Sequence, residues 1–248
     1  MSDLNRNTAS GYAHATRAEA GYVDEGLRSF LLRVYNYMAI GLAVTGVAAF
    51  GTAAMAVSNG QLTSFGYALY ASPLKWVVML APLGFVFFLS ARINSMSVSA
   101  AQLTFWAFAA LMGLSLSSIF LVFTGESIAR VFFLTAATFG AMSLYGYTTK
   151  RDLSGMGSFL FMGLIGIILA SIVNIFIGSS AIQFAVSVIG VLIFTGLTAY
   201  DTQQIKEMYY VGDDGTVAGR KAISGALRLY LDFINLFMML LQLFGNRE

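Results

Sequence analysis

Residues 222–244 read AISGALRLYLDFINLFMMLLQLF. A run of this length can cross a bilayer, since a helix of ~20 residues spans the ~30 Å hydrocarbon core. Its less apolar positions recur every three or four residues, at Ser224, Arg228, Asp232, Asn235, Met239, Gln242 and, just beyond, Asn246. On a helix this spacing makes one continuous stripe among Leu, Phe, Ile and Met side chains. Lipid cannot solvate such a stripe, so we expect this segment to lie at the centre of a helical bundle.

Six further apolar segments precede this one. They cover residues 34–57, 74–91, 100–123, 128–147, 156–177 and 181–200. Hydrophobic residues make up 58% of the chain and charged residues 10%, against roughly 25% charged residues in soluble domains. The sequence therefore predicts an all-α integral membrane protein with seven transmembrane helices, the seventh central in the bundle.

The distribution of Lys and Arg predicts the orientation. With the N-terminus inside, ten fall in cytoplasmic segments and three outside: Arg6, Arg17, Arg28, Arg33, Arg92, Lys150, Arg151, Lys206, Arg220 and Lys221 against Lys75, Arg130 and Arg247. Residues 1–29 are expected to form a polar, largely disordered cytoplasmic tail, and residues 30–248 the transmembrane domain. Seven spans then place the C-terminus outside, and the longest connection is expected at residues 201–221.

Several functional classes are excluded by composition. The chain has no cysteine, which removes disulfides, thiolate metal sites and thiol nucleophiles. Its single histidine, His14, lies in the polar tail, away from any expected site. The formal net charge of +2 does not favour a nucleic-acid partner. We therefore expect neither an enzyme nor a bound cofactor.

Two carboxylates are predicted at membrane depth, where an ionisable side chain costs ~2.5–3.5 kcal/mol on insertion scales. Asp232 lies roughly 15 Å along the seventh span, at 1.5 Å per residue, and Asp201 closes the sixth. Structural explanations compete with functional ones. Arg228 and Asp232 are spaced as an i,i+4 ion pair that would help a polar helix insert. Likewise, Asp201 is within reach of Lys206, and Arg92 has the position of an ordinary cytoplasmic anchor.

Four strings resemble the Bax inhibitor family, particularly its bacterial members. They are Tyr200-Asp-Thr-Gln-Gln-Ile-Lys206, Leu229-Tyr-Leu-Asp-Phe-Ile-Asn-Leu-Phe237, Lys150-Arg-Asp-Leu-Ser154 and Asn174-Ile-Phe176. The resemblance implies a pH-sensitive calcium leak in which Asp201 and Asp232 form a hydrogen-bonded, proton-sensing pair. It also implies an arginine latch at the end of the second helix, for which Arg92 is the candidate. Arg228, one turn from Asp232, departs from the family pattern.

The implied mechanism is physically reasonable. Two carboxylates in a low-dielectric site cannot both ionise cheaply, so they are expected to share a proton that holds a closed state. The same pair, Asp201 and Asp232, would form a weak site for calcium, which prefers oxygen ligands. The expected path is lined by Ser224, Arg228, Asn235 and Gln242.

The predicted partners are calcium, protons and the lipid of a bacterial inner membrane. Two other functions stay open at this point. One is a membrane-embedded regulatory protein that binds a protease or another membrane complex through its polar tail, without ion flux. The other is a proton-coupled transporter that uses the same aspartates as a relay.

Overall fold

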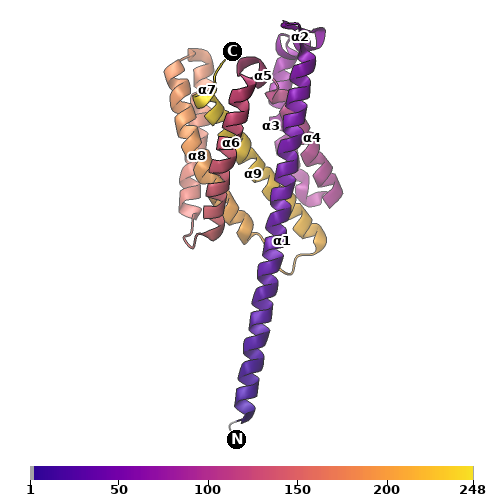
Figure 1. Ribbon diagram of the computed structural model, residues 1–248, viewed down its shortest axis with the longest axis vertical. Coiled ribbons are helices and arrows are strands. Elements are labelled where there is room, and N and C mark those ends of the chain that lie inside the picture. The colour runs from indigo at the N-terminus through magenta and orange to yellow at the C-terminus, as the bar shows by residue number, and fades with distance from the viewer. Residues whose placement is uncertain (1–2, 248) are drawn as a thin grey trace.

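The computed structural model describes residues 3–247, with side chains described from Glu25 onward, and it is a bundle of long helices (Figure 1). Seven helical segments are long and apolar enough to cross a membrane. Their helices are α1 (Asp3–Ala56), α3 (Leu74–Arg92), α4 (Val98–Leu116), α6 (Gly125–Thr148), α7 (Ser154–Ile177), α8 (Ser180–Glu207) and α9 (Gly215–Phe244). The predicted fold class is confirmed.

Short elements join some of these helices. A two-stranded hairpin, β1 (Val57–Ser58) and β2 (Gln61–Leu62), and helix α2 (Ser64–Tyr70) connect α1 to α3. The 3-10 turn η1 (Ile93–Ser95) follows α3, and α5 (Ile119–Val122) follows α4. Between α7 and α8 the chain reverses at Gly178, whose φ of 69° suits glycine. The Asn174 side chain closes this turn by accepting a hydrogen bond from the Ser179 backbone N–H at 2.9 Å.

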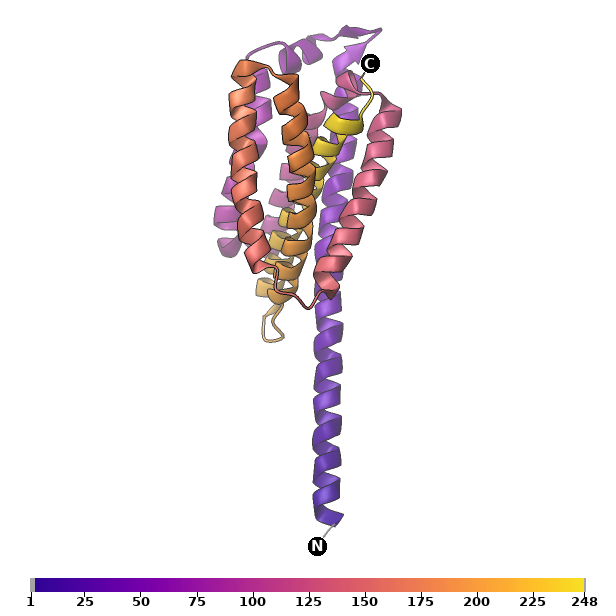
Figure 2. The same ribbon diagram turned by 90° about the vertical axis from the view of Figure 1, so that its left-hand side faces the viewer.

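The central position predicted for the last span is confirmed. Helix α9 packs against α1, α4, α6 and α8 and runs through the middle of the bundle (Figures 1 and 2). In its most apolar 18-residue window 56% of the residues are buried, against 11% for α7. Large apolar side chains on the outer helices are exposed instead, among them Phe176. That distribution fits a protein whose outer surface faces lipid.

Helix α1 is longer than its transmembrane part. Residues 3–24 continue it as a helix that projects away from the bundle (Figure 2), where the sequence predicted a largely disordered tail over residues 1–29. The stretch contains no proline, and extending a formed helix avoids the cost of nucleating a new one. The two termini of the described chain lie at opposite ends of the molecule (Figure 1), as an odd number of spans requires.

The connection predicted at residues 201–221 is wrong. Helix α8 continues to Glu207 and α9 begins at Gly215, so only residues 208–214 join them. Asp214 caps α9, since its carboxylate accepts hydrogen bonds from the N–H groups of Thr216 and Val217. The prediction was wrong because each span was taken to end at its last apolar residue, whereas α8 and α9 both extend beyond their apolar residues. Asp201 therefore lies inside α8 and not at its end.

Candidate functional site

The two aspartates predicted from the sequence lie beside each other. Asp232 projects from α9 and is 5% exposed, and Asp201 projects from the facing helix α8. Their carboxyl groups are close enough for their charges to interact. The Oδ2 atom of Asp232 is buried and has no hydrogen-bond partner among the described residues. Burying a carboxyl oxygen without a hydrogen-bond donor costs free energy, so the burial of this atom requires an explanation.

Arg228 is the cation nearest to this pair. Its guanidinium Nη1 lies 3.9 Å from Oδ1 of Asp201, on the neighbouring helix, and half of its side chain is exposed. The i,i+4 ion pair between Arg228 and Asp232 that the sequence allowed is not among the ion pairs of the described residues. Lys206, the other cation considered, turns elsewhere. Its Nζ donates a hydrogen bond of 2.9 Å to the Tyr147 carbonyl oxygen.

Arg92 ends helix α3, as the sequence predicted, and is exposed. No ion pair between Arg92 and an acidic side chain occurs in the part of the chain that the structure describes. The turn after α3 is instead held by Arg220 of α9, which donates hydrogen bonds of 2.6 Å to the carbonyl oxygens of Met96 and Asn94. In this conformation Arg228, and not Arg92, forms an ion pair with Asp201.

Two partly polar cavities lie along α9. One is lined by residues that precede Asp232 in this helix, and the other by residues that follow it. The first, of about 370 Å³, is lined by Ser224, Arg228 and the neighbouring cations Arg220 and Lys221. The second, of about 440 Å³, is lined by Gln242 together with polar side chains of α7 and α8, including Asn174 and Gln183.

Asp232 and Asn235 occupy the intervening stretch of the helix. Asn235 donates a hydrogen bond of 2.8 Å to the carbonyl oxygen of Leu231, within α9. Of the four residues predicted to line a path, three therefore line cavities, and Asn235 is half-buried between those cavities.

A chain of hydroxyl groups joins α1, α6 and α8. The Thr202 hydroxyl donates to the Thr198 carbonyl oxygen at 2.7 Å and lies 2.9 Å from the hydroxyl of Ser143 on α6. A hydroxyl has one hydrogen, so Ser143 donates to Thr202, and the Tyr35 hydroxyl of α1 donates to Ser143. Three helices are thus joined next to Asp201.

Tyr230 anchors α9 on its opposite face. Its ring is fully buried, and its hydroxyl lies 2.6 Å from that of Thr45 on α1. Because the Thr45 hydroxyl is placed to donate to the carbonyl oxygens of Gly41 and Ala109, Tyr230 is the donor between the two hydroxyls. A buried phenol with a satisfied hydroxyl fixes the rotation of α9.

Gln203 fixes the loop between α6 and α7. Its amide donates a hydrogen bond to the Arg151 carbonyl oxygen and accepts one from the Leu153 N–H, both at 2.8 Å. In the same loop the Ser154 N–H donates to Asp152, and this bond lowers the pKa of the Asp152 carboxyl below its ordinary value. The role of Gln203 was not predicted from the sequence, although Gln203 lies in the Tyr200–Lys206 string that resembles the Bax inhibitor family.

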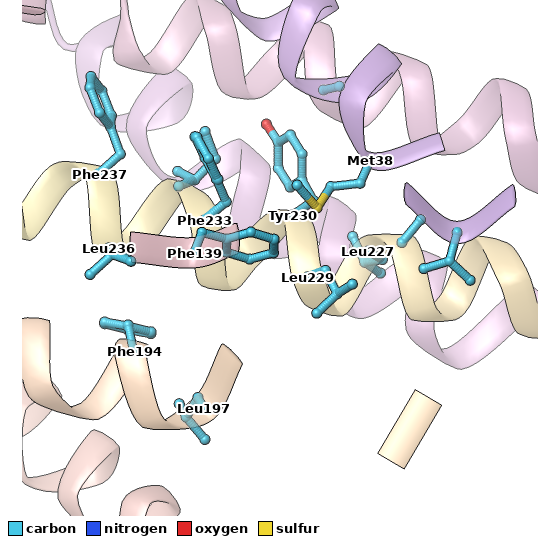
Figure 3. Close-up of a cluster of buried hydrophobic side chains, with 14 of the residues drawn as sticks. Met38, Phe139, Phe194, Leu197, Leu227, Leu229, Tyr230, Phe233, Leu236 and Phe237 are labelled. Atoms are coloured by element: carbon cyan, nitrogen blue, oxygen red, sulfur yellow. The ribbon is translucent and has the colours of Figure 1, made fainter. Parts of the chain in front are cut away.

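An aromatic cluster surrounds the residue after Asp232. The ring of Phe233 packs edge-on against Phe132 and Phe139 of α6, with centroids 5.5 Å apart in both pairs. Figure 3 shows Phe233 and Phe237 on one side of α9, and Leu236 facing Phe194 of α8 on the other. Aromatic side chains of α6 therefore pack against one side of α9, while Asp232 faces α8.

Comparison with known proteins identifies the family. The family model described as "Inhibitor of apoptosis-promoting Bax1" matches residues 27–248. The chain belongs to the Bax inhibitor family. The inner membrane protein YbhL of Escherichia coli K12 is 49% identical over 225 residues, covering 90% of this chain and 94% of YbhL. A Caulobacter vibrioides protein is 46% identical over the full length of both chains. A Rickettsia prowazekii protein is 48% identical over 91% of this chain and 92% of its own.

Two of the four strings that carried the resemblance to the Bax inhibitor family meet at the aspartate pair. The string at 200–206 supplies Asp201, Thr202 and Gln203, while the string at 229–237 supplies Tyr230 and Asp232. Each of these side chains contacts a different helix or loop from its own. Together they determine how α8, α9 and the surrounding helices meet at the pair.

Proposed function

We propose that this member of the Bax inhibitor family is a pH-sensitive, calcium-permeable leak channel whose path follows the polar face of α9. The observation that carries the proposal is the position of Asp201 and Asp232 between two partly polar cavities. The cavity-lining residues Arg228 and Gln242 are 14 positions apart, or roughly 21 Å along a helix, which is most of a ~30 Å hydrocarbon core. The pair is the barrier between the two cavities.

A shared proton accounts for the arrangement of charges. If both carboxyl groups were ionised, two negative charges would face one guanidinium in a buried site. With one proton between them, the group formed with Arg228 is neutral, and the proton supplies the hydrogen bond that Oδ2 of Asp232 otherwise lacks. Removal of that proton makes the two carboxylates repel each other. We infer that this repulsion separates α8 from α9 and joins the cavities.

The site is suited to passing calcium and not to retaining it. Carboxylate oxygens are ligands that calcium accepts, but a tight site needs six to eight oxygens. No cluster of three or more acidic or histidine side chains that could hold a metal occurs among the described residues. The first cavity also carries Arg220, Lys221 and Arg228, which disfavour a divalent cation. A slow leak follows from these two features.

The proposed location is a bacterial inner membrane, with the N-terminus on the cytoplasmic side. The relative YbhL is named an inner membrane protein, and the ten-to-three division of cations supports the orientation. With this orientation the cavity containing Arg228 opens toward the cytoplasm.

A second candidate function is a regulatory protein without ion flux. One observation favours it, since residues 3–24 extend α1 well beyond the bundle, where another protein could bind them (Figure 2). Purified protein in liposomes with no other protein present distinguishes the two functions. The leak proposal expects calcium entry that depends on the protein, and calcium entry equal to that of empty liposomes would favour the regulatory function. Entry that requires an imposed proton gradient would indicate a proton-coupled transporter instead.

A further inference from the structure

A groove lies between α1 and α6, separate from the two cavities along the polar face of α9. Its volume is about 660 Å³, and its lining is almost entirely apolar. Leu32, Leu144 and Phe132 on its edges are exposed, and in a membrane these edges face lipid. Its floor includes Phe139 and Phe233, which Figure 3 shows side by side.

The groove runs along α1 and α6 for a length that corresponds to about one leaflet. On α1 its lining extends from Arg28 to Leu42, and on α6 from Tyr147 to Phe132. These stretches correspond to roughly 21–23 Å of helix, against ~15 Å for half of the hydrocarbon core plus the adjoining headgroup region. The two helices are antiparallel, so Arg28 and Tyr147 lie at the same end.

That end of the groove is basic. Arg28 lines it directly. Lys206 lies beside it, with its Nζ 5.2 Å from the centre of the Tyr147 ring and bonded to the Tyr147 carbonyl oxygen. The other end, at Leu42 and Phe132, is apolar. An apolar channel of one-leaflet length with cations at its membrane surface matches a phospholipid that has an acidic headgroup.

We propose that the α1–α6 groove binds one acyl chain of a phospholipid whose acidic headgroup contacts Arg28 and Lys206. The groove also shares side chains with the surroundings of the aspartates. Ser143 lines it and donates a hydrogen bond to Thr202, next to Asp201, while Phe233 lines it next to Asp232. A bound chain therefore packs against the groups that hold α6, α8 and α9 together. Lipid binding itself is independent of the proposed leak, whereas an effect of the lipid on flux rests on it.

The experiment uses the full chain and phosphatidylglycerol with a photoreactive group on its acyl chain. After irradiation we expect labelled peptides to map to residues 28–42 and 132–147, and unlabelled phosphatidylglycerol to compete for this labelling. Gly140→Leu should abolish most of it, because Gly140 lines the groove and a Cβ atom added there meets no protein atom within 4 Å, which leaves space for the leucine side chain to occupy the groove. Arg28→Gln should weaken labelling roughly fivefold, as expected for one cation at a membrane surface.

Two matched controls accompany these variants. Gly166→Leu adds the same bulk at an equally open, exposed glycine of α7, and Arg33→Gln removes an exposed cation of α1 that does not line the groove. Both should label like the native protein. Labelling spread evenly over the lipid-facing helices, or failure of unlabelled lipid to compete with the native protein, would overturn the proposal. Equal labelling by a phosphatidylcholine probe would overturn the part that assigns the headgroup. None of these readouts depends on calcium flux.

Discussion

The close packing of Gly146 on α6 against the backbone of α8 gives a quantitative prediction for Gly146→Ala. A Cβ atom built on Gly146 would lie 2.2 Å from the Ala199 carbonyl oxygen and 2.9 Å from its carbonyl carbon. Ordinary contacts of this kind begin at 3.4 Å. Since the clashing atoms belong to the backbone, rotation of a side chain cannot relieve the overlap. The helices must therefore separate locally by about 1 Å, in an interior packed as densely as an organic crystal.

Overpacking of this kind costs about 1–3 kcal/mol. Gly140, on the same helix, is the matched control, since a Cβ there has open space. Both substitutions gain the same helix propensity, up to ~1 kcal/mol, so their difference isolates the steric cost. We expect Gly146→Ala to be less stable than Gly140→Ala by about 1–3 kcal/mol. Asp201 lies two residues beyond Ala199, so the same displacement should also alter basal flux.

The assay is equilibrium unfolding in detergent micelles, followed by circular dichroism, for the native chain and the two variants. A loss of stability confined to Gly146→Ala would support the close packing of α6 on α8. Equal stability of the two variants, or a more stable Gly146→Ala, would refute the reasoning.

Three further predictions concern the proposed path and the topology. Single cysteines at Ser224 and Gln242 should react with water-soluble thiol reagents, whereas one at the buried Leu236 should not; equal labelling would remove the case for a path along α9. Arg228→Ser should move the flux midpoint to higher pH, because loss of the cation favours the protonated pair, and Arg92→Ala should change it less; the reverse order would return Arg92 to the latch role. Reporters fused at the two chain ends should read opposite sides of the membrane, the N-terminal one cytoplasmic, and a shared side would contradict the seven-span assignment.

Much of the fold could be predicted from length and periodicity. Seven apolar runs gave the seven spans, and the stripe from Ser224 to Gln242 placed α9 at the centre, because membrane interiors exclude unsolvated polar groups. Helix ends were harder to predict. Apolarity ends near Tyr200, but α8 continues to Glu207 because Thr202, Gln203 and Ile205 are buried against other elements. Burial by partners distant in sequence leaves no local signature.

The site was only partly predictable for the same reason. The aspartates were conspicuous because charge at membrane depth is rare. Which cation pairs with them depends on how α8 and α9 face each other, and this is not encoded in either helix alone. The i,i+4 spacing within α9 suggested that Arg228 pairs with Asp232. In the structure Arg228 pairs with Asp201 of α8. The hydroxyl chain through Tyr35 and Ser143 joins residues more than 100 positions apart. Nothing in either segment alone indicates that contact.

The central claim is that Asp201 and Asp232 act as one proton-sharing unit, and calcium flux into protein-only liposomes measured across a pH series tests it most directly. The account predicts steep pH dependence near neutrality for the native chain. Asp201→Asn and Asp232→Asn should each flatten the profile, and the double variant should be little different from either single one, because the pair acts together. A native flux that does not change with pH, or single variants that keep the native profile, would contradict the account.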